Sequence, residues 1–144
     1  MEIPKHPLGF KIKQINNVYE KDLTKSLKNI GITASQCAVL DYLFHTNKEE
    51  VNQIDVERHL NLKNPTVTGL LKRLDEKGFI LCVPSNTDRR RKKIYLTEKA
   101  YDIQRRMELN RKKLDRSLTR GMSKREIEAV HKALDKMLYN IAEP

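Results

Sequence analysis

Several residue types are scarce in this 144-residue sequence, and each scarcity excludes a class of protein. It contains only two cysteines, Cys37 and Cys82. Two cysteines are too few for the disulfide framework of a small secreted domain, and neither has a neighbour at metal-ligand spacing. The four histidines are scattered over different predicted elements, so we expect surface or packing roles for them. We therefore expect neither a metal site nor a cofactor.

Long apolar runs and catalytic motifs are also missing. No stretch approaches the roughly 20 apolar residues of a membrane span, and the N-terminus lacks a signal-peptide core. We therefore expect a cytoplasmic protein without membrane contact. There is no nucleophile with a matching base, no paired carboxylates in an apolar run, and neither a GxGxxG nor a Walker loop. An enzyme is therefore not expected.

Acidic residues are outnumbered. The 29 Lys and Arg against 19 Asp and Glu give a net charge of +10, whereas 38% hydrophobic and 33% charged residues are ordinary for one soluble domain, residues 1–144. Residues 51–97 hold ten basic against five acidic residues, and residues 99–120 hold eight against three. This excess favours a polyanionic partner. The alternative is a solvated basic surface that serves solubility.

The segment NPTVTGLLKRLDEKG, residues 64–78, predicts a short amphipathic helix. Asn64 is the expected N-cap, Pro65 the first helical residue, and Gly78 the stop. Apolar residues recur at i, i+3, i+4 and i+7 and predict a buried face: Val67, Leu70, Leu71 and Leu74. The opposite face is polar and carries Thr66, Thr68, Lys72 and Arg73.

A second short helix precedes this one. Asn52 and Asp55 predict its N-terminal capping box, and only the three residues 61–63 connect it to the next helix. Two short helices joined this tightly indicate a helix-turn-helix, whose second helix offers its polar face to a DNA major groove.

A basic hairpin is predicted directly afterwards. Residues 79–83 and 93–96 have strand patterns, and residues 84–87 are turn formers. The tip and the return carry DRRRKK, residues 88–93. Such a hairpin beside a helix-turn-helix indicates a wing that suits the electronegative minor groove.

The order of these motifs resembles the MarR/SlyA family of winged-helix regulators over nearly the whole chain. Matching residues are Asp88, Arg90, Leu96 and Thr97 in the wing, and Thr33, Gln36 and Leu40 before it. The resemblance implies a homodimer that reads the two halves of a palindrome in double-stranded DNA. It also implies that Arg90 enters the minor groove and that Asp88 braces it.

The predicted DNA-binding set combines the polar helix face with the wing. It comprises Asn64, Pro65, Thr66, Thr68, Lys72, Arg73, Asp88, Arg89, Arg90 and Arg91. The threonines can contact base edges or a thymine methyl, while Lys72 and Arg73 can reach guanine or phosphate. For Arg89 and Arg91 we expect phosphate contact or solvation, since a wing tip inserts one or two side chains. Any helix member can instead be a solvated surface residue.

Two positions depart from the family pattern. Gly69 stands where many relatives carry a base-reading arginine, which implies a different sequence preference or greater reliance on the wing. Cys82 stands where the first wing strand often carries an arginine that supports the Asp-x-Arg pair. Cys82 can be a redox switch, because a thiol near cations gains thiolate character. The alternative is a cysteine packed within the strand.

Three further amphipathic helices surround the predicted winged helix. Their apolar stripes run from Phe10 to Ile30, from Ala100 to Leu118 and from Ile127 to Ile141. The expected fold is mainly α: a winged helix-turn-helix with a two-stranded wing (32–97) and dimerisation helices at both ends (1–31 and 98–144). Packing against a second copy covers the stripes, and the alternative is a monomeric bundle.

The resemblance also implies an effector, because many family members release DNA when an anionic phenolic compound binds beside the dimer helices. Tyr19, Tyr42, Tyr101 and Arg105 have suitable chemistry, although tyrosines on helical stripes are also common core residues. We predict a homodimeric transcriptional repressor with a palindromic operator. The alternatives are a sequence-neutral basic protein that packages nucleic acid, and a winged helix that binds protein.

Overall fold

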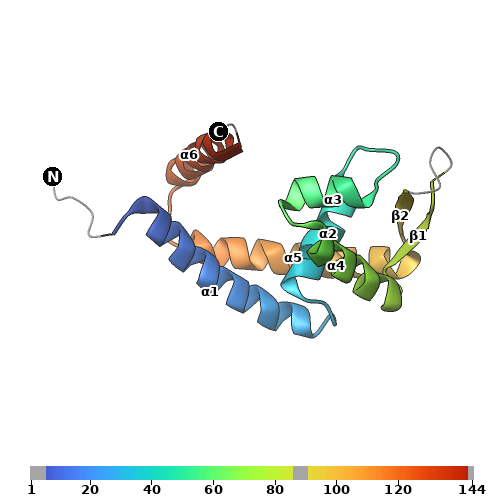
Figure 1. The fold of residues 1–144 in the computed structure, drawn as a ribbon. Coiled ribbons are helices and arrows are strands. Elements are labelled where there is room, and N and C mark those ends of the chain that lie inside the picture. The colour runs from blue at the N-terminus through green and yellow to red at the C-terminus, as the bar shows by residue number, and fades with distance from the viewer. Residues whose placement is uncertain (1–5, 86–90, 143–144) are drawn as a thin grey trace. The chain divides into compact units, whose positions relative to one another are not determined.

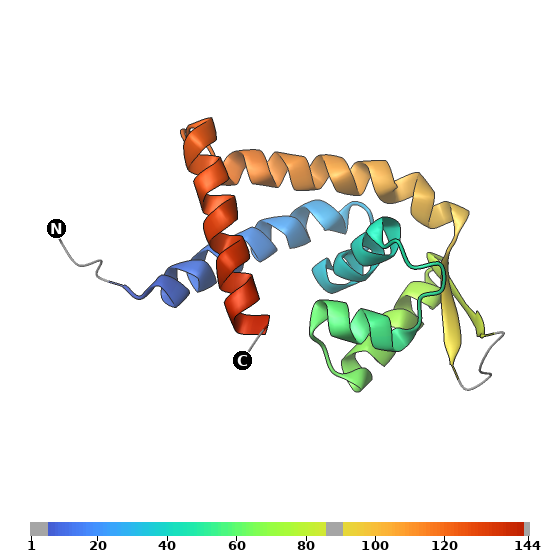
Figure 2. The same cartoon turned by 90° about the horizontal axis from the view of Figure 1, so that it is seen from above.

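The computed structural model describes residues 6–85 and 91–142. Within this part the chain forms six helices and two strands (Figures 1 and 2). In chain order they are α1 (Leu8–Lys28), α2 (Ala34–His45), α3 (Gln53–Leu60), α4 (Asn64–Glu76), β1 (Ile80–Pro84), β2 (Lys92–Leu96), α5 (Glu98–Leu118) and α6 (Lys124–Ala142). The predicted mainly α fold with a two-stranded wing is confirmed. The chain divides into two compact units, Met1–Arg111 and Lys112–Pro144.

Three helices begin with capping boxes. In a capping box, the side-chain oxygen of the N-cap residue accepts a hydrogen bond from the backbone N–H of the residue three positions later. The side chain of that later residue in turn accepts a hydrogen bond from the backbone N–H of the N-cap residue. The pairs are Thr33 with Gln36 before α2, Asn52 with Asp55 before α3, and Ser123 with Glu126 before α6. The box at Asn52 was predicted above from the sequence and is confirmed, and the other two have the same three-residue spacing.

The start of α4 differs from the prediction. Lys63 is the N-cap, without a side-chain cap bond, and Asn64 is the first helical residue, so the expected cap at Asn64 is wrong. The Val67 N–H, which a cap at Asn64 would have to bind, donates instead to the Lys63 carbonyl at 3.1 Å, so the helix begins one residue earlier. The Asn64 side chain donates to Glu57 Oε2 of α3 at 3.2 Å. The stop at Gly78 is confirmed by its φ of +81°, which favours glycine.

The predicted apolar face of α4 is confirmed, since Val67, Leu71 and Leu74 are buried and Leu70 is half-buried. This face belongs to one hydrophobic core in the first unit. Each other element of that unit contributes buried residues to it, among them Leu27, Leu40, Val56, Ile80, Ile94 and Met107. Figure 2 shows α2, α3 and α4 gathered together, with the hairpin at their edge. The core therefore fixes which face of α4 remains outside.

The hairpin is fastened to the segment before α3. Strands β1 and β2 are antiparallel, with Ile80 opposite Leu96. The Ile94 N–H donates to the Val51 carbonyl at 2.9 Å, and the Ser85 hydroxyl donates to Glu50 Oε1 at 2.5 Å. These bonds hold the base of the wing against the helix-turn-helix.

Helices α1 and α6 leave apolar side chains exposed. Those of α1 are Leu8, Phe10, Ile12, Ile15 and Val18, and those of α6 are Val130, Leu134, Leu138 and Ile141. No residue of α6 is buried. Within residues 6–85 and 91–142, no helix combines the length and apolar character that crossing a membrane requires. The exposed apolar faces are a feature that any account of the protein must explain.

Candidate nucleic-acid interface

Helix α4 turns its predicted contact residues outwards. Six exposed residues form this surface: Asn64, Pro65, Thr66, Thr68, Lys72 and Arg73. They are exposed because the opposite side of the same helix is buried in the core. Exposure is what a contact surface requires, and contact of these residues with DNA stays a prediction.

Helix α3 supports the outer face of α4 through two side chains that sequence reasoning missed. The Gln53 amide donates to Thr68 Oγ1 at 2.8 Å and to the Asn64 carbonyl at 3.3 Å, and Glu57 accepts from the Asn64 side chain. The Thr68 hydroxyl therefore already has a partner, which leaves its methyl group as the freer contact. No periodic signal marks Gln53, because its contacts run between helices.

The described part of the wing comprises the residues up to Ser85 and those from Arg91 onwards. Three predicted site residues, Asp88, Arg89 and Arg90, lie outside the described residues. Arg91 is exposed, and its backbone carbonyl accepts from the Ser85 N–H at 2.8 Å. The Lys93 ammonium lies 3.6 Å from Glu50 Oε2. Lys93 therefore contributes to the base of the wing.

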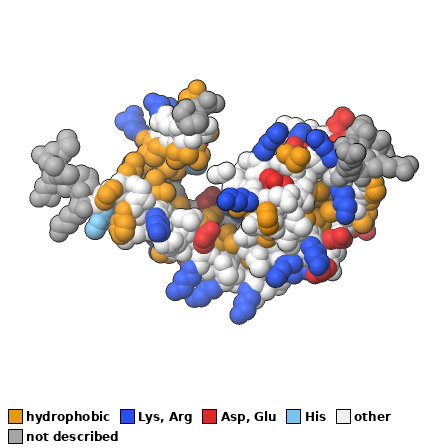
Figure 3. All heavy atoms as spheres, in the orientation of Figure 1, with side chains coloured by type: hydrophobic (Ala, Val, Ile, Leu, Met, Phe, Trp, Pro, Cys, Tyr) orange, Lys and Arg blue, Asp and Glu red, His pale blue; other side chains and the backbone are white. Residues whose placement is uncertain are grey.

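Exposed cations accompany the helix-turn-helix. They are Arg58, Lys63, Lys72 and Arg73, together with Arg91 and Lys92 on the wing. Figure 3 shows Lys and Arg side chains over the helix-turn-helix. A surface of this kind attracts phosphates through counterion release.

The two thiols are not activated. Cys82 is half-buried opposite Ile94, and burial together with the Asp75 carboxylate raises the pKa of its thiol despite the charge of Lys92. Burial, assisted by Asp41, raises the pKa of Cys37 to about 12. Both thiols are therefore protonated at neutral pH. This favours packing over redox sensing for Cys82.

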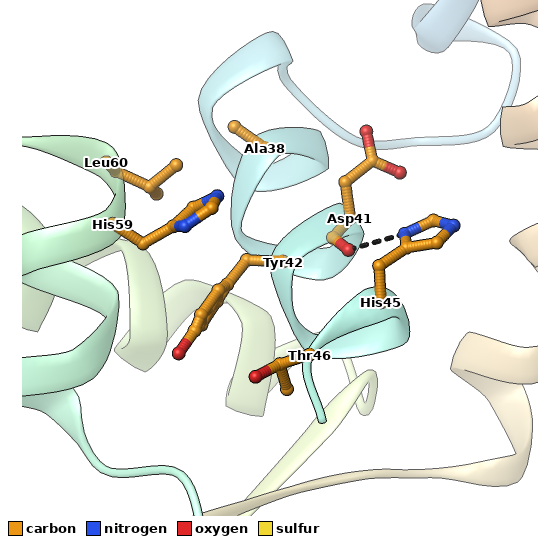
Figure 4. A pocket seen from close by; sticks show the side chains of 7 residues that line it. All are labelled: Ala38, Asp41, Tyr42, His45, Thr46, His59 and Leu60. Atoms are coloured by element: carbon orange, nitrogen blue, oxygen red, sulfur yellow. Dashed lines mark hydrogen bonds between the residues drawn. The ribbon is translucent and has the colours of Figure 1, made fainter. Parts of the chain in front are cut away.

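A pocket of about 500 Å³ opens between α2 and α3 (Figure 4). It is lined by Ala38, Asp41, Tyr42, His45, Thr46, His59 and Leu60. The rings of Tyr42 and His59 lie 4.4 Å apart, and His45 Nδ1 lies 2.8 Å from the Asp41 carbonyl oxygen. Among the described residues, no three His, Cys, Asp or Glu side chains gather as metal ligands would. The pocket is therefore lined by one phenol ring and two imidazole rings, together with a carboxylate and small or apolar side chains.

Two of the four predicted effector residues lie at pockets. Tyr42 lines the pocket in Figure 4. Tyr19 lines a neighbouring one of about 240 Å³, formed by α1, α2 and the end of α3. Tyr101 and Arg105 are exposed on α5 and line neither of these two pockets. The predicted set is therefore not assembled into one site within this chain.

Solved structures share the fold over nearly the whole chain. MepR of S. aureus in complex with DNA is 25% identical, with a TM-score of 0.87 over 94% of this chain and 99% of that one. A MarR regulator from Methanosarcina mazei is 20% identical, with a TM-score of 0.88 over 94% and 96%. The regulator SlyA is 21% identical, with a TM-score of 0.87 over 96% of each chain. The predicted MarR/SlyA-type winged-helix fold is confirmed by these similarities.

Sequence comparison gives the family itself. Residues 21–107 match the family described as transcriptional regulator SarA/Rot. The match spans the end of α1, the helix-turn-helix, the hairpin and the first half of α5, which is more than half of the chain. The expectation that the chain is not an enzyme is confirmed by this family of regulators. The chain belongs to the SarA/Rot family of winged-helix transcriptional regulators.

Proposed function

We propose that this regulator is a cytoplasmic homodimeric repressor that binds a palindromic operator in double-stranded DNA and is released by a small organic effector. The observation that carries the DNA-binding part is the polar face of α4, the recognition helix, which is exposed beside a basic wing. Its size and position suit a major groove, with the wing in the adjacent minor groove. The DNA complex of MepR, whose fold is similar, supports this assignment.

The homodimer is supported by the exposed apolar faces of α1 and α6. Four apolar side chains of α6 are between 40% and 79% exposed in the single chain. Full burial of an exposed side chain of this kind contributes roughly 1.5–3 kcal/mol, and each of these four has at least 40% of its surface left to bury, so a second copy is favoured as their cover. Two recognition helices about 34 Å apart would then read half-sites one turn of DNA apart.

The effector is proposed for the pocket between α2 and α3. Tyr42, His45 and His59 line it and supply a phenol hydroxyl and two imidazoles as hydrogen-bonding groups for a small phenolic anion. A titration of hydroxybenzoate against the protein–operator complex checks this part of the proposal. An operator affinity that does not change up to millimolar hydroxybenzoate contradicts it.

The central experiment is selection of bound sequences from a random duplex pool at about 150 mM salt, where non-specific phosphate binding is weakened. We expect an enriched palindrome with half-sites about one helical turn apart. The affinity for this palindrome should exceed that for random DNA by about 10³-fold or more. If no sequence is enriched, the chain is a sequence-neutral binder or recognises protein, and the proposed operator does not exist.

Replacing Arg90 by Ala should weaken operator binding by roughly 1–3 kcal/mol and reduce the preference for A·T-rich flanks, because a narrow A·T minor groove attracts arginine. Affinities measured on operators with A·T-rich and G·C-rich flanks check this. Arg125→Ala is the matched control, since Arg125 is exposed on α6. If both variants respond to the flanks as the unchanged protein does, the wing does not read the minor groove.

A further inference from the structure

Lys77 extends from the end of α4 to the turn between α1 and α2. Its ammonium donates to the Gly31 carbonyl at 2.8 Å and to Gln36 Oε1 at 2.8 Å. Gln36 is 1% exposed, and the same oxygen accepts from the Thr33 N–H in the capping box of α2. Lys77 therefore joins the end of α4 to two residues that precede it in the sequence by 46 and 41 positions.

The acceptor at Gly31 is itself tied to α1. Gly31 has a φ of +83°, and its N–H donates to the Leu27 carbonyl at 3.0 Å. Leu27 is fully buried in the core. A bond to the Gly31 carbonyl therefore holds the end of α1, because the turn cannot move independently of that helix.

The start of α5 holds the same end of α4 through other atoms. The Thr97 hydroxyl donates to the Gly78 carbonyl at 2.6 Å, and the Lys99 ammonium donates to the Lys77 carbonyl at 2.5 Å. The Lys99 ammonium also lies 4.7 Å from the centre of the Phe79 ring. The recognition helix is thus clamped at its C-terminal end between the end of α1 and the start of α5.

We infer that Lys77 is a positioning residue that orients the recognition helix relative to α1 and thereby sets the half-site spacing that the homodimer accepts. This inference rests on the proposed function, in which α1 belongs to the dimerising segments. In such a dimer the direction of α4 relative to α1 determines the distance between the two recognition helices.

The role of Lys77 differs from that of a phosphate-binding lysine. Its ammonium is engaged by two protein acceptors, and bonds between a charged donor and protein oxygens are stronger than neutral ones. Loss of the bonds should therefore affect geometry more than general attraction to DNA. The salt dependence of binding to random DNA should stay close to that of the unchanged protein.

The test uses the full chain and the selected operator, rebuilt with spacers from two base pairs shorter to two longer. A change of one base pair moves one half-site by about 3.4 Å along the axis. The unchanged protein should prefer its best spacer over its neighbours by about tenfold or more, because a displaced half-site loses base contacts. In Lys77→Met we expect this preference to fall to about threefold or less, because the charge-assisted bonds are gone.

Two control variants test whether the effect comes from the hydrogen bonds of Lys77. Lys77→Arg retains a charged donor and should keep the spacing preference. Lys25→Met removes the same charge from an exposed position on α1 and should also keep it. If Lys77→Met does not fold, Lys77→Gln, which is shorter but polar, takes its place in the same titrations.

The outcomes separate the clamp from the proposed function. If the unchanged protein has no preferred spacer, the proposed palindrome reader fails, and the role of Lys77 fails with it. If the unchanged protein discriminates and Lys77→Met keeps the same ratio between spacers, only the inference about Lys77 is overturned. An equal loss of affinity at every spacer overturns it too, since that pattern reflects lower stability alone.

Discussion

Replacing Leu134 by Glu should leave the protein monomeric and lower its affinity for a palindromic operator by about 10³-fold. Leu134 lies in the exposed apolar face of α6, between Val130 and Leu138. A carboxylate buried at a dimer interface without a partner is strongly unfavourable. A monomer reads one half-site and loses the gain in effective concentration that links the two. Sedimentation equilibrium and operator titration together check this result.

Ala129→Glu is the matched control for Leu134→Glu. Both changes add one negative charge to α6, but helical spacing places residue 129 on the side opposite the apolar face. The control variant should remain dimeric and bind the operator nearly as the unchanged protein does. A Leu134→Glu protein that stays dimeric would show that the apolar face of α6 is not the interface.

Replacing Leu74 by Ala should lower the free energy of unfolding by roughly 2–5 kcal/mol. Leu74 is fully buried on the inner face of α4, so the change removes apolar contacts and leaves a cavity. That loss is a large share of the roughly 5–15 kcal/mol that stabilises a typical domain. Urea denaturation at one fixed protein concentration measures it, because dimer stability depends on concentration.

The control for Leu74→Ala is the same substitution at Leu81, which is 52% exposed on β1. We expect Leu81→Ala to cost about 1 kcal/mol or less, the range of strand preferences. Equal losses in the two variants would mean that Leu74 is not part of a tightly packed core. A large loss at Leu74 alone would tie the stability of the domain to the recognition helix.

The features that sequence predicted well are local. The capping boxes at Thr33, Asn52 and Ser123 join residues three positions apart, so their partners can be found by spacing alone. The buried face of α4 follows from helical periodicity, and the stop at Gly78 follows from the backbone conformation that glycine permits. The two strands of the hairpin follow from residue type and alternation in two adjacent segments, whereas their register, with Ile80 opposite Leu96, comes from the structure.

Contacts between segments that are distant in the sequence were not predicted. The N-cap at Asn64 was wrong because the helical hydrogen bonds begin one residue earlier, where the Val67 N–H binds the Lys63 carbonyl. The Asn64 side chain binds a carboxylate of α3, and sequence alone does not indicate that approach. Tyr101 and Arg105 do not join Tyr42 at its pocket, because they are exposed on a different helix. The contacts of Gln53 with α4 have no counterpart in any periodic pattern.

The amino-acid sequence by itself determined the helices, the wing, the exposed polar face of α4 and the basic charge, because each depends on residue type and near-neighbour spacing. The tertiary structure decided which side chains support that face and how its helix is held. Gln53 meets Thr68, and Lys77 meets Gly31, only after the core has brought distant segments together. Such contacts depend on how the chain packs in three dimensions. The spacing of residues along the sequence does not give the distances between segments that pack together.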